Sequence, residues 1–351
     1  MKQLPTSIQR TQFALYERAR CRFVSQAGVT LVEILITLAI GLIVTLAVAV
    51  TYVGSRTTAT AVDNLSRLNE NAKLTLDFLS REIQMAGFYP SIFPNPAQPL
   101  LRGEYINLKA PRRAYNAGIF GCDGAPFDPT TANNTTTFGC GAAVAGAPDS
   151  LVVNYFTTVS QQDVGLDNVS VNTDCESQPV ALDPDNATRA GAGLPILLSN
   201  RFTATTTNYS SAVGTVNTEV ATLSLACNGN GGNAETTDYA QLFDGINQLV
   251  FRYAVHDLNT SGETPQRFFT AAEVNALPVI NGRSGWQRVS GVSVCLLMQS
   301  LNASRTTSLG TGGGTYTDCY GTVVTPAAGD RFFYKRYDRV VAVRNQLTGI
   351  Q

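Results

Sequence analysis

Residues 29–53 form one long run of apolar side chains, VTLVEILITLAIGLIVTLAVAVTYV, in which the only charge is Glu33. As an α-helix this run is about 37 Å long, enough to cross a bilayer core of roughly 30 Å. The pattern therefore predicts a membrane-spanning helix near the start of the chain.

From residue 54 to residue 86 the apolar positions recur at steps of three and four, the spacing of one helix face. The predicted stripe consists of Val62, Leu65, Leu68, Ala72, Leu76, Leu79 and Ile83. Gly87, Pro90 and Pro94 are expected to end the helix. A single helix from 29 to about 86 is about 87 Å long. Its second half is expected to pack on a sheet of the same chain, and a coiled coil is the weaker alternative because the stripe covers few turns.

Beyond residue 90 the pattern changes to short β-prone runs separated by turn-rich stretches. The runs are residues 151–157, 195–198, 220–227, 248–255, 289–298 and 340–343. A helix followed by strands predicts an α+β fold with an antiparallel sheet.

Two further patterns in the body are interpreted as structural. The glycine-rich stretches 228–233 and 309–315 do not lead into a Lys-Ser/Thr helix start, so they are expected to be plain loops, not phosphate cradles. The C-terminal charges are expected on the outward face of strands, with Phe332, Phe333 and Val340 inward. These charges are Asp330, Arg331, Lys335, Arg336, Asp338 and Arg339.

Charge is distributed unevenly along the chain. The 28 residues before the apolar run carry five basic side chains and one acidic side chain, a net charge of +4 that favours a cytoplasmic N-terminus. The remainder carries 20 basic and 25 acidic side chains, a net charge of −5, and is expected outside the cytoplasm. The total of 25 Lys+Arg against 26 Asp+Glu gives no indication of direct nucleic-acid binding. The single histidine, His256, excludes metal sites that need two histidines.

Six cysteines follow Cys21, which lies in the basic leader. An even number in an exported body suggests three disulfides, for which fifteen pairings exist. Pairing of sequence neighbours is expected, as Cys122–Cys140, Cys175–Cys227 and Cys295–Cys319, each stabilising by about 3–4 kcal/mol. Buried free thiols remain an alternative. A zinc site is disfavoured because the chain has no CxxC pattern.

The junction QAGVTLVE, with Gly28 directly before an apolar residue, Thr, Leu, an apolar residue and Glu33, resembles the processing site of type IV prepilins. The resemblance implies that a prepilin peptidase cuts after Gly28 and methylates the new N-terminus at Val29. Glu33 then becomes the fifth residue of the mature chain. Two features depart from the family pattern: Val29 stands where Phe is usual, and the leader is long.

Glu33 has a physical role in this interpretation. A carboxylate within an apolar helix costs several kcal/mol unless it is paired or protonated. In a bundle of such helices, the family resemblance implies that Glu33 pairs with the free N-terminal ammonium group of a neighbour. The alternative is that Glu33 lies near the lipid headgroups and reaches them.

Segments of the body are similar to one subgroup, the PilW-type minor pilins. They include LSREIQMAGFY at the helix exit, IFGCDG at 119–124 and DSLVV at 149–153, followed by 174–175, 225–227, 242–253, 286–297 and 337–345. The family often has an acidic loop at the position of 256–263. Here only Asp257 and Glu263 are carboxylates, so a solvated hairpin loop is favoured over a calcium site.

The resemblance implies a type IV pilin fold and a minor pilin that helps prime pilus assembly and sits in the pilus or its tip complex. The implied partners are the prepilin peptidase, other minor pilins, the major pilin, the inner-membrane assembly platform and a large tip adhesin. Before assembly the chain would cross the inner membrane once. No cofactor, metal or catalytic residue is expected. Whether the pilus serves twitching, DNA uptake or adhesion stays open.

Two other functions are weighed against this one. A type II secretion pseudopilin of the J kind shares the N-terminal design, although the body is large for that group. A membrane-anchored periplasmic enzyme would need a base for its nucleophile, and His256 alone gives it little support. The expected organisation is a cleaved leader at 1–28, a membrane or filament-core helix at 29–53, an amphipathic helix at 54–88 and an exported body at 89–351.

Overall fold

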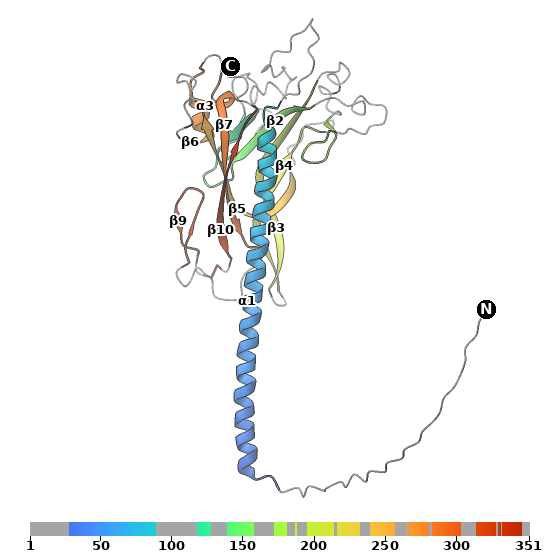
Figure 1. Cartoon of the computed structure of the whole chain (residues 1–351), viewed down its shortest axis with the longest axis vertical. Coiled ribbons are helices and arrows are strands. Elements are labelled where there is room, and N and C mark those ends of the chain that lie inside the picture. Colours follow the sequence, from blue (N-terminus) through green and yellow to red (C-terminus); the bar gives the residue numbers. More distant parts are fainter. Residues whose placement is uncertain are drawn as a thin grey trace, which may run out of the picture. The chain divides into compact units, whose positions relative to one another are not determined.

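The computed structural model describes residues 28–88, 118–127, 139–157, 172–180, 187, 195–213, 216–231, 239–256, 265, 267–280, 283–302, 314–327, 329–330 and 332–345. Its elements, shown in Figure 1, are α1 (Leu31–Met85), β1 (Ile119–Cys122), β2 (Ser150–Thr157), β3 (Ile196–Val213), β4 (Val216–Asn228), β5 (Ala240–Val255), β6 (Phe268–Phe269), α3 (Ala271–Ala276), η2 (Trp286–Arg288), β7 (Val289–Gln299), β8 (Tyr316–Thr317), β9 (Val323–Val324) and β10 (Tyr334–Ala342).

The chain divides into two compact units, Met1–Ser55 and Arg56–Gln351, and α1 contributes to both. In the first unit the described chain is the N-terminal part of α1 with the three residues before it. The second unit, called the body below, contains the rest of α1 and all the strands. A long helix with an antiparallel sheet confirms the α+β class.

The main sheet has the strand order β1-β2-β3-β4-β5-β7-β10, and β6 pairs with β5 beside this path. Every pairing in it is antiparallel. A separate two-stranded sheet joins β8 to β9. Each run predicted as a strand lies wholly or mostly in one, but β3, β5 and β10 extend well beyond the predicted runs.

One face of α1 and the inner face of the sheet share a single hydrophobic core. On the helix, Leu68, Ala72, Leu76, Leu79 and Ile83 are all buried, as the sequence stripe predicts. Phe78 makes edge-to-face contacts with Phe202 and Phe243, with ring centroids 5.7 and 5.8 Å apart. The stripe therefore packs on a sheet of its own chain.

The two N-terminal members of the predicted stripe are exceptions. Val62 is 62% exposed and Leu65 is 42% exposed. At this level the first buried side chain of the helix is a polar one, Asn64, whose amide donates to the Asn302 carbonyl at 3.3 Å. Spacing alone predicts which face is apolar, but the length over which that face is covered depends on where the strands end.

The helix ends at a glycine in a left-handed conformation. Gly87 has φ +71°, and its N–H donates to the Asn154 carbonyl of β2 at 2.8 Å. The next residue continues this pairing, because the Phe156 N–H donates to the Phe88 carbonyl at 2.8 Å. The predicted end at Gly87 is confirmed, whereas Pro90 and Pro94 lie outside the described residues.

A second glycine allows two strands of the body to pack closely. A Cβ at Gly121 on β1 would overlap the hydroxyl oxygen of Tyr253, a side chain from β5 that is 1% exposed. The Tyr253 ring also contacts Trp286, with centroids 4.8 Å apart. Among the described residues the Tyr253 hydroxyl has no hydrogen-bond partner.

We therefore expect Gly121→Ala to lower the free energy of unfolding by about 1–3 kcal/mol, the usual cost of overpacking. Tyr253→Phe should be neutral or slightly stabilising, because it removes a buried hydroxyl without breaking a hydrogen bond. Denaturant unfolding of the full chain in detergent, followed by the fluorescence of Trp286, measures both. A loss above about 1 kcal/mol in Tyr253→Phe would contradict the packing described.

Candidate functional site

The segment most closely tied to function by sequence is the start of α1, where Thr30 caps the helix. The Glu33 N–H lies 3.3 Å from the Thr30 hydroxyl and 3.0 Å from its carbonyl oxygen. The Ile34 N–H donates to the same carbonyl at 3.2 Å. A threonine that accepts from a first-turn N–H is a helix N-cap. The helix therefore begins directly after Gly28, Val29 and Thr30, which are exposed and outside the helix.

Glu33 occupies the third helical position after this cap. A Thr followed three residues later by Glu is the sequence signature of a capping box, and an acid in the first turn is favoured by the helix dipole. Within the described residues the Glu33 carboxylate has no ionic partner. Thr30 is not among the site residues predicted above, although the T-x-x-E spacing before an apolar run is the signal for this cap.

The part of α1 after Glu33 exposes apolar side chains around its surface. Its most apolar 18-residue window has a mean hydropathy of 2.7, and none of that window is buried. By length and composition this helix is able to cross a membrane. Three hydroxyls within it donate back to helix carbonyls: Thr37 to Ile34 at 2.9 Å, Thr45 to Gly41 at 2.9 Å and Thr51 to Ala47 at 2.8 Å. These hydroxyl groups therefore make their hydrogen bonds within the helix, as polar groups in an apolar environment must.

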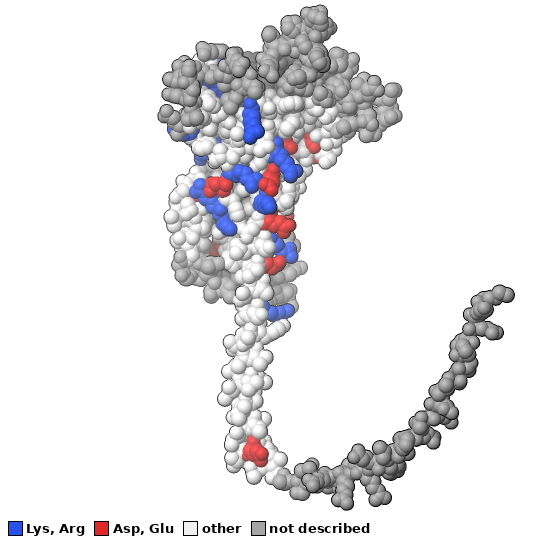
Figure 2. All heavy atoms as spheres, viewed as in Figure 1, with Lys and Arg blue, Asp and Glu red and all other residues white. Residues whose placement is uncertain are grey.

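Within the body, charged side chains of β10 hold α1 in place, and Figure 2 shows these charges gathered along the helix and the adjoining strand. Arg339 donates to Asp77 and lies 3.4 Å from the Ser80 hydroxyl. Lys335 donates to Asn69 at 2.9 Å. The hydrogen bond from Arg339 lowers the pKa of Asp77 below its usual value.

This contact corrects the predicted orientation of the C-terminal strand. Lys335 and Arg339 lie on the face that meets α1, whereas Val340, predicted to point inward, is 63% exposed. Phe332 and Phe333 are half-buried, and Arg331 lies outside the described residues. Neighbouring residues of a strand point to opposite faces, so the predicted charges could not all point outward. Lys335 and Arg339 lie on the face toward α1, where their long side chains reach over the helix surface.

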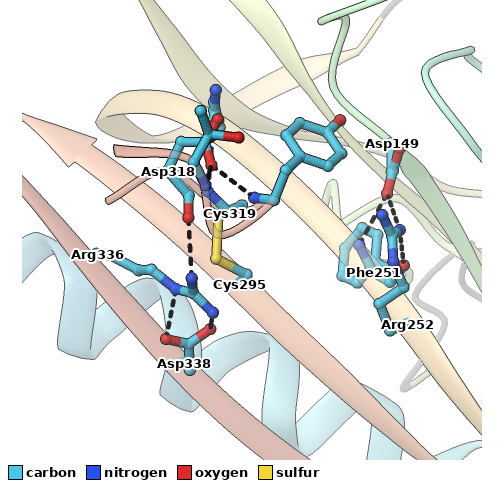
Figure 3. Close-up of a disulfide and its surroundings, with 11 residues drawn as sticks. Asp149, Phe251, Arg252, Cys295, Asp318, Cys319, Arg336 and Asp338 are labelled. Atoms are coloured by element: carbon cyan, nitrogen blue, oxygen red, sulfur yellow. Dashed lines mark hydrogen bonds and ion pairs between the residues drawn. A yellow bond between two sulfur atoms is a disulfide. The ribbon is translucent and has the colours of Figure 1, made fainter. Parts of the chain in front are cut away.

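Several segments that carried the PilW resemblance form one buried polar cluster, part of which Figure 3 shows. Asp149, only 3% exposed, accepts from the Gly124 N–H at 2.7 Å and from the Phe251 N–H at 2.9 Å. The Arg252 guanidinium is 3.5 Å away. Asp123 accepts from the first two N–H groups of α3 at 3.0 and 2.7 Å. The residues of these segments join β1, β2, β5 and α3, so their role here is structural.

All six cysteines of the body form disulfides, and the pairs are Cys122–Cys140, Cys175–Cys227 and Cys295–Cys319. The last pair ties the turn at Asp318 to β7, and Arg336 donates to the Asp318 carbonyl at 2.9 Å (Figure 3).

Beside the second disulfide, the Asp174 carboxylate accepts from the Gly231 N–H at 2.7 Å. A Cβ at Gly229 would overlap the same carboxylate. The described part of the glycine-rich stretch 228–233 therefore encloses an aspartate.

The residues weighed for other chemistry are placed as follows. The His256 N–H donates to the Arg288 carbonyl at 3.0 Å, and the Arg288 guanidinium donates to the His256 carbonyl at 3.2 Å. In the part of the chain that the structure describes, no three His, Cys, Asp or Glu side chains are grouped to hold a metal ion. The loop with Asp257 and Glu263, considered for calcium, lies outside the described residues.

Two family models match the chain. The model of the prokaryotic N-terminal methylation motif matches residues 24–49, which include Gly28, Val29 and Glu33. The model of type IV pilus-assembly protein W matches residues 210–345, from the end of β3 through β10. These matches support a type IV pilus minor pilin of the PilW type.

Among solved structures, a type IV-like pilin from Thermus thermophilus is similar to this PilW-type chain with a TM-score of 0.35 and 11% identity. The alignment covers 80% of this chain and 98% of that one. No curated protein matches the chain. The pilin family and its fold are those of structural proteins.

The buried carboxylate of this PilW-type body predicts a pH dependence. Burial raises the pKa of Asp149 from 3.8 to about 6. A raised folded-state pKa means that the stability tied to protonation is fully present below about 3.8 and is lost as pH rises through about 6. The wild-type chain should therefore gain about 1 kcal/mol from this group between pH 7 and pH 5.

Asp149→Asn should be less stable than wild type at both pH values, because its amide faces an N–H donor. It should also lose the increase in stability between pH 7 and pH 5, because the amide does not titrate. Denaturant unfolding of both proteins at pH 5 and pH 7 tests it. Since Glu82 and Glu176 also have raised pKa values through burial, the quantity to compare is the difference between the two proteins. Equal pH dependence in both would contradict the assignment to Asp149.

Proposed function

We propose that this chain is a minor pilin that helps prime type IV pilus assembly and sits in the pilus or its tip complex with other minor pilins. The observation that carries the proposal is a capped helix that starts at Leu31, three residues after Gly28, and is apolar and uncovered over its N-terminal half. Such a helix can lie in lipid and can later pack in a bundle of like helices.

The proposed sequence of events follows from this segment. The basic leader holds the N-terminus in the cytoplasm, and the body lies in the periplasm. The prepilin peptidase cuts after Gly28 and methylates Val29, which leaves Thr30 free to cap the shortened chain. The mature helix then moves from the inner membrane into a helix bundle through the assembly platform, next to other minor pilins and the major pilin. A large tip adhesin is a further proposed partner.

Glu33 is proposed to set the depth at which the subunit enters the bundle. Its carboxylate lies one turn into a helix that carries no other charge before Arg56, and it has no ionic partner in the described chain. In a low-dielectric bundle the N-terminal ammonium group of a neighbour would neutralise it. Breaking a buried ion pair by removal of one partner costs about 3–5 kcal/mol.

We expect Glu33→Ala to lower the amount of this subunit in sheared pili at least about tenfold, as one broken buried pair implies. Asp63→Ala is the matched control, because Asp63 is an exposed acid of the same helix whose pair with Arg67, 3.1 Å apart, lies at the surface. Wild-type levels of Glu33→Ala in pili would refute the pairing role.

Mass spectrometry of the wild-type subunit should find an N-terminal N-methylated Val29.

Deletion of the gene should reduce the number of surface pili, and the number should recover when pilus retraction is also blocked. This outcome is expected of a subunit that starts assembly. Without such a subunit assembly is slow, and retraction removes pili faster than they form. Electron microscopy of both strains provides the count. An unchanged number of pili in the single deletion would overturn the proposed function.

A further inference from the structure

The hairpin of β3 and β4 extends past the strands that flank it. Its register continues from Arg201 opposite Asn228 to Val213 opposite Val216. On one side β2 stops pairing with β3 at Phe202, and on the other β5 begins pairing with β4 at Leu223. Residues 208–213 and 216–221 form what we call the hairpin arm, about 20 Å long at 3.3 Å per residue.

Each strand of the arm has one edge without a strand partner among the described residues. Such an edge presents a row of N–H and C=O groups at the spacing of a sheet. It is a template on which another extended chain can add as a new strand.

The arm also lacks the features by which proteins usually protect such edges. Its two strands read NYSSAV and VNTEVA, with Glu219 as the only charge and no proline. By contrast, β10 at the end of the main sheet carries four charges in YKRYDRVVA, and β1 at the other end has four residues. Charges, prolines and short lengths are the common protections of exposed edges. Among the described edges, the arm is thus the long one that is left open.

The position of the arm follows from contacts along α1. The Asn200 amide donates to Glu82 at 2.8 Å, and Phe202 contacts Phe78. Further along, Asn71 donates to the Asp244 carbonyl at 3.3 Å, and Asp244 pairs with Ser224 on β4. Rising numbers on β3 therefore correspond to falling numbers on α1. The arm points toward the N-terminal end of the helix segment within the body, as Figure 1 shows.

We infer that the hairpin arm binds an extended strand from the body of a different pilin subunit. The inference rests on the proposed function, in which pilins lie side by side with their helices parallel. The arm points toward the end of the body at which α1 enters it. A strand of six residues would gain its affinity from backbone hydrogen bonds and its specificity from alternate side chains.

A second copy of the same chain is a poor occupant. Two identical arms that pair through the same edge, β3 with β3 or β4 with β4, as antiparallel strands are related by a two-fold axis perpendicular to the strands. Because β3 runs opposite to α1, that axis also makes the two α1 segments antiparallel. Their N-terminal chains would then leave the pair at opposite ends, which two subunits anchored in one membrane cannot do. Pairing of the β3 edge of one copy with the β4 edge of the next would keep the helices parallel. Such a head-to-tail contact adds copies without closing, which does not fit the tip position proposed above. A different pilin has neither restriction.

The first test is a shortened hairpin. Thr207 and Thr222 are register partners, so residues 208–221 can be replaced by Asn-Gly, which closes a two-residue hairpin turn. The base of the hairpin keeps its side-chain contacts, including the Thr222 hydroxyl to the Ile246 carbonyl at 3.2 Å. The shortened full-length chain should have the same denaturation midpoint as wild type, followed by Trp286 fluorescence. It should retain less than a fifth of the other pilins that co-purify with the tagged wild-type chain from membranes.

The second test identifies the occupant directly. The photo-crosslinker p-benzoylphenylalanine is placed at Ser211 in the arm or, as the control, at Val340, which is 63% exposed on β10. Both variants are produced in cells that contain all pilins. We expect the Ser211 variant to form at least five times more adduct, with a partner that mass spectrometry identifies as a different pilin. A homodimer as the main adduct, or equal adducts from both positions, would overturn the inference.

Pilus counts separate this inference from the proposed function. If gene deletion reduces pili and the shortened chain restores them fully while retaining its partners, the arm inference is overturned and the proposed function stands. If gene deletion leaves pili unchanged, the proposed function fails, whereas a Ser211 adduct with another pilin still supports binding at the arm.

Discussion

The body depends on the contact between one buried row of α1 and the inner face of the antiparallel sheet. The row consists of Leu68, Ala72, Leu76, Leu79 and Ile83. The helix cannot bury this row alone, and the sheet cannot bury its inner face without the helix. The same helix carries an uncovered apolar surface closer to its N-terminus. One element therefore contributes a buried row to the core of the body and, closer to its N-terminus, has an apolar surface that is able to cross a membrane.

Polar contacts determine how the body is closed around this core. Charges on β10 reach over α1, Asp149 joins β1 and β5 to the start of β2, and three disulfides tie loops to strands. Buried polar groups such as Asp149 need several donors to offset their desolvation. The body thus gains much of its specific geometry from a small number of satisfied polar groups, and its strand edges differ in how well they are protected.

Much of the fold could be predicted from periodicity. Both ends of the helix lie within a residue or two of the predicted limits, and each predicted β-prone run lies wholly or mostly within a strand. Strand lengths could not be predicted, because β3 and β10 continue through Thr-rich and charged sequence that has no apolar alternation. The outward position of Val340 and the exposure of Val62 likewise depend on which neighbouring element covers each position. The role of Thr30 was present in the sequence as a capping signature but was not read.

The sequence by itself determined the N-terminal segment that matches the methylation motif, because Gly28, Thr30, Glu33 and the apolar run are local in the chain and need no long-range contact to be recognised. It also determined the helix, since its apolar row repeats at a helical period. Only the tertiary structure decided that Asp149 binds donors from Gly124 and Phe251, that Lys335 and Arg339 face the helix, and that the β3–β4 hairpin extends beyond its neighbours. These features join residues far apart in the chain, and their geometry arises from strand register, which local sequence patterns do not encode.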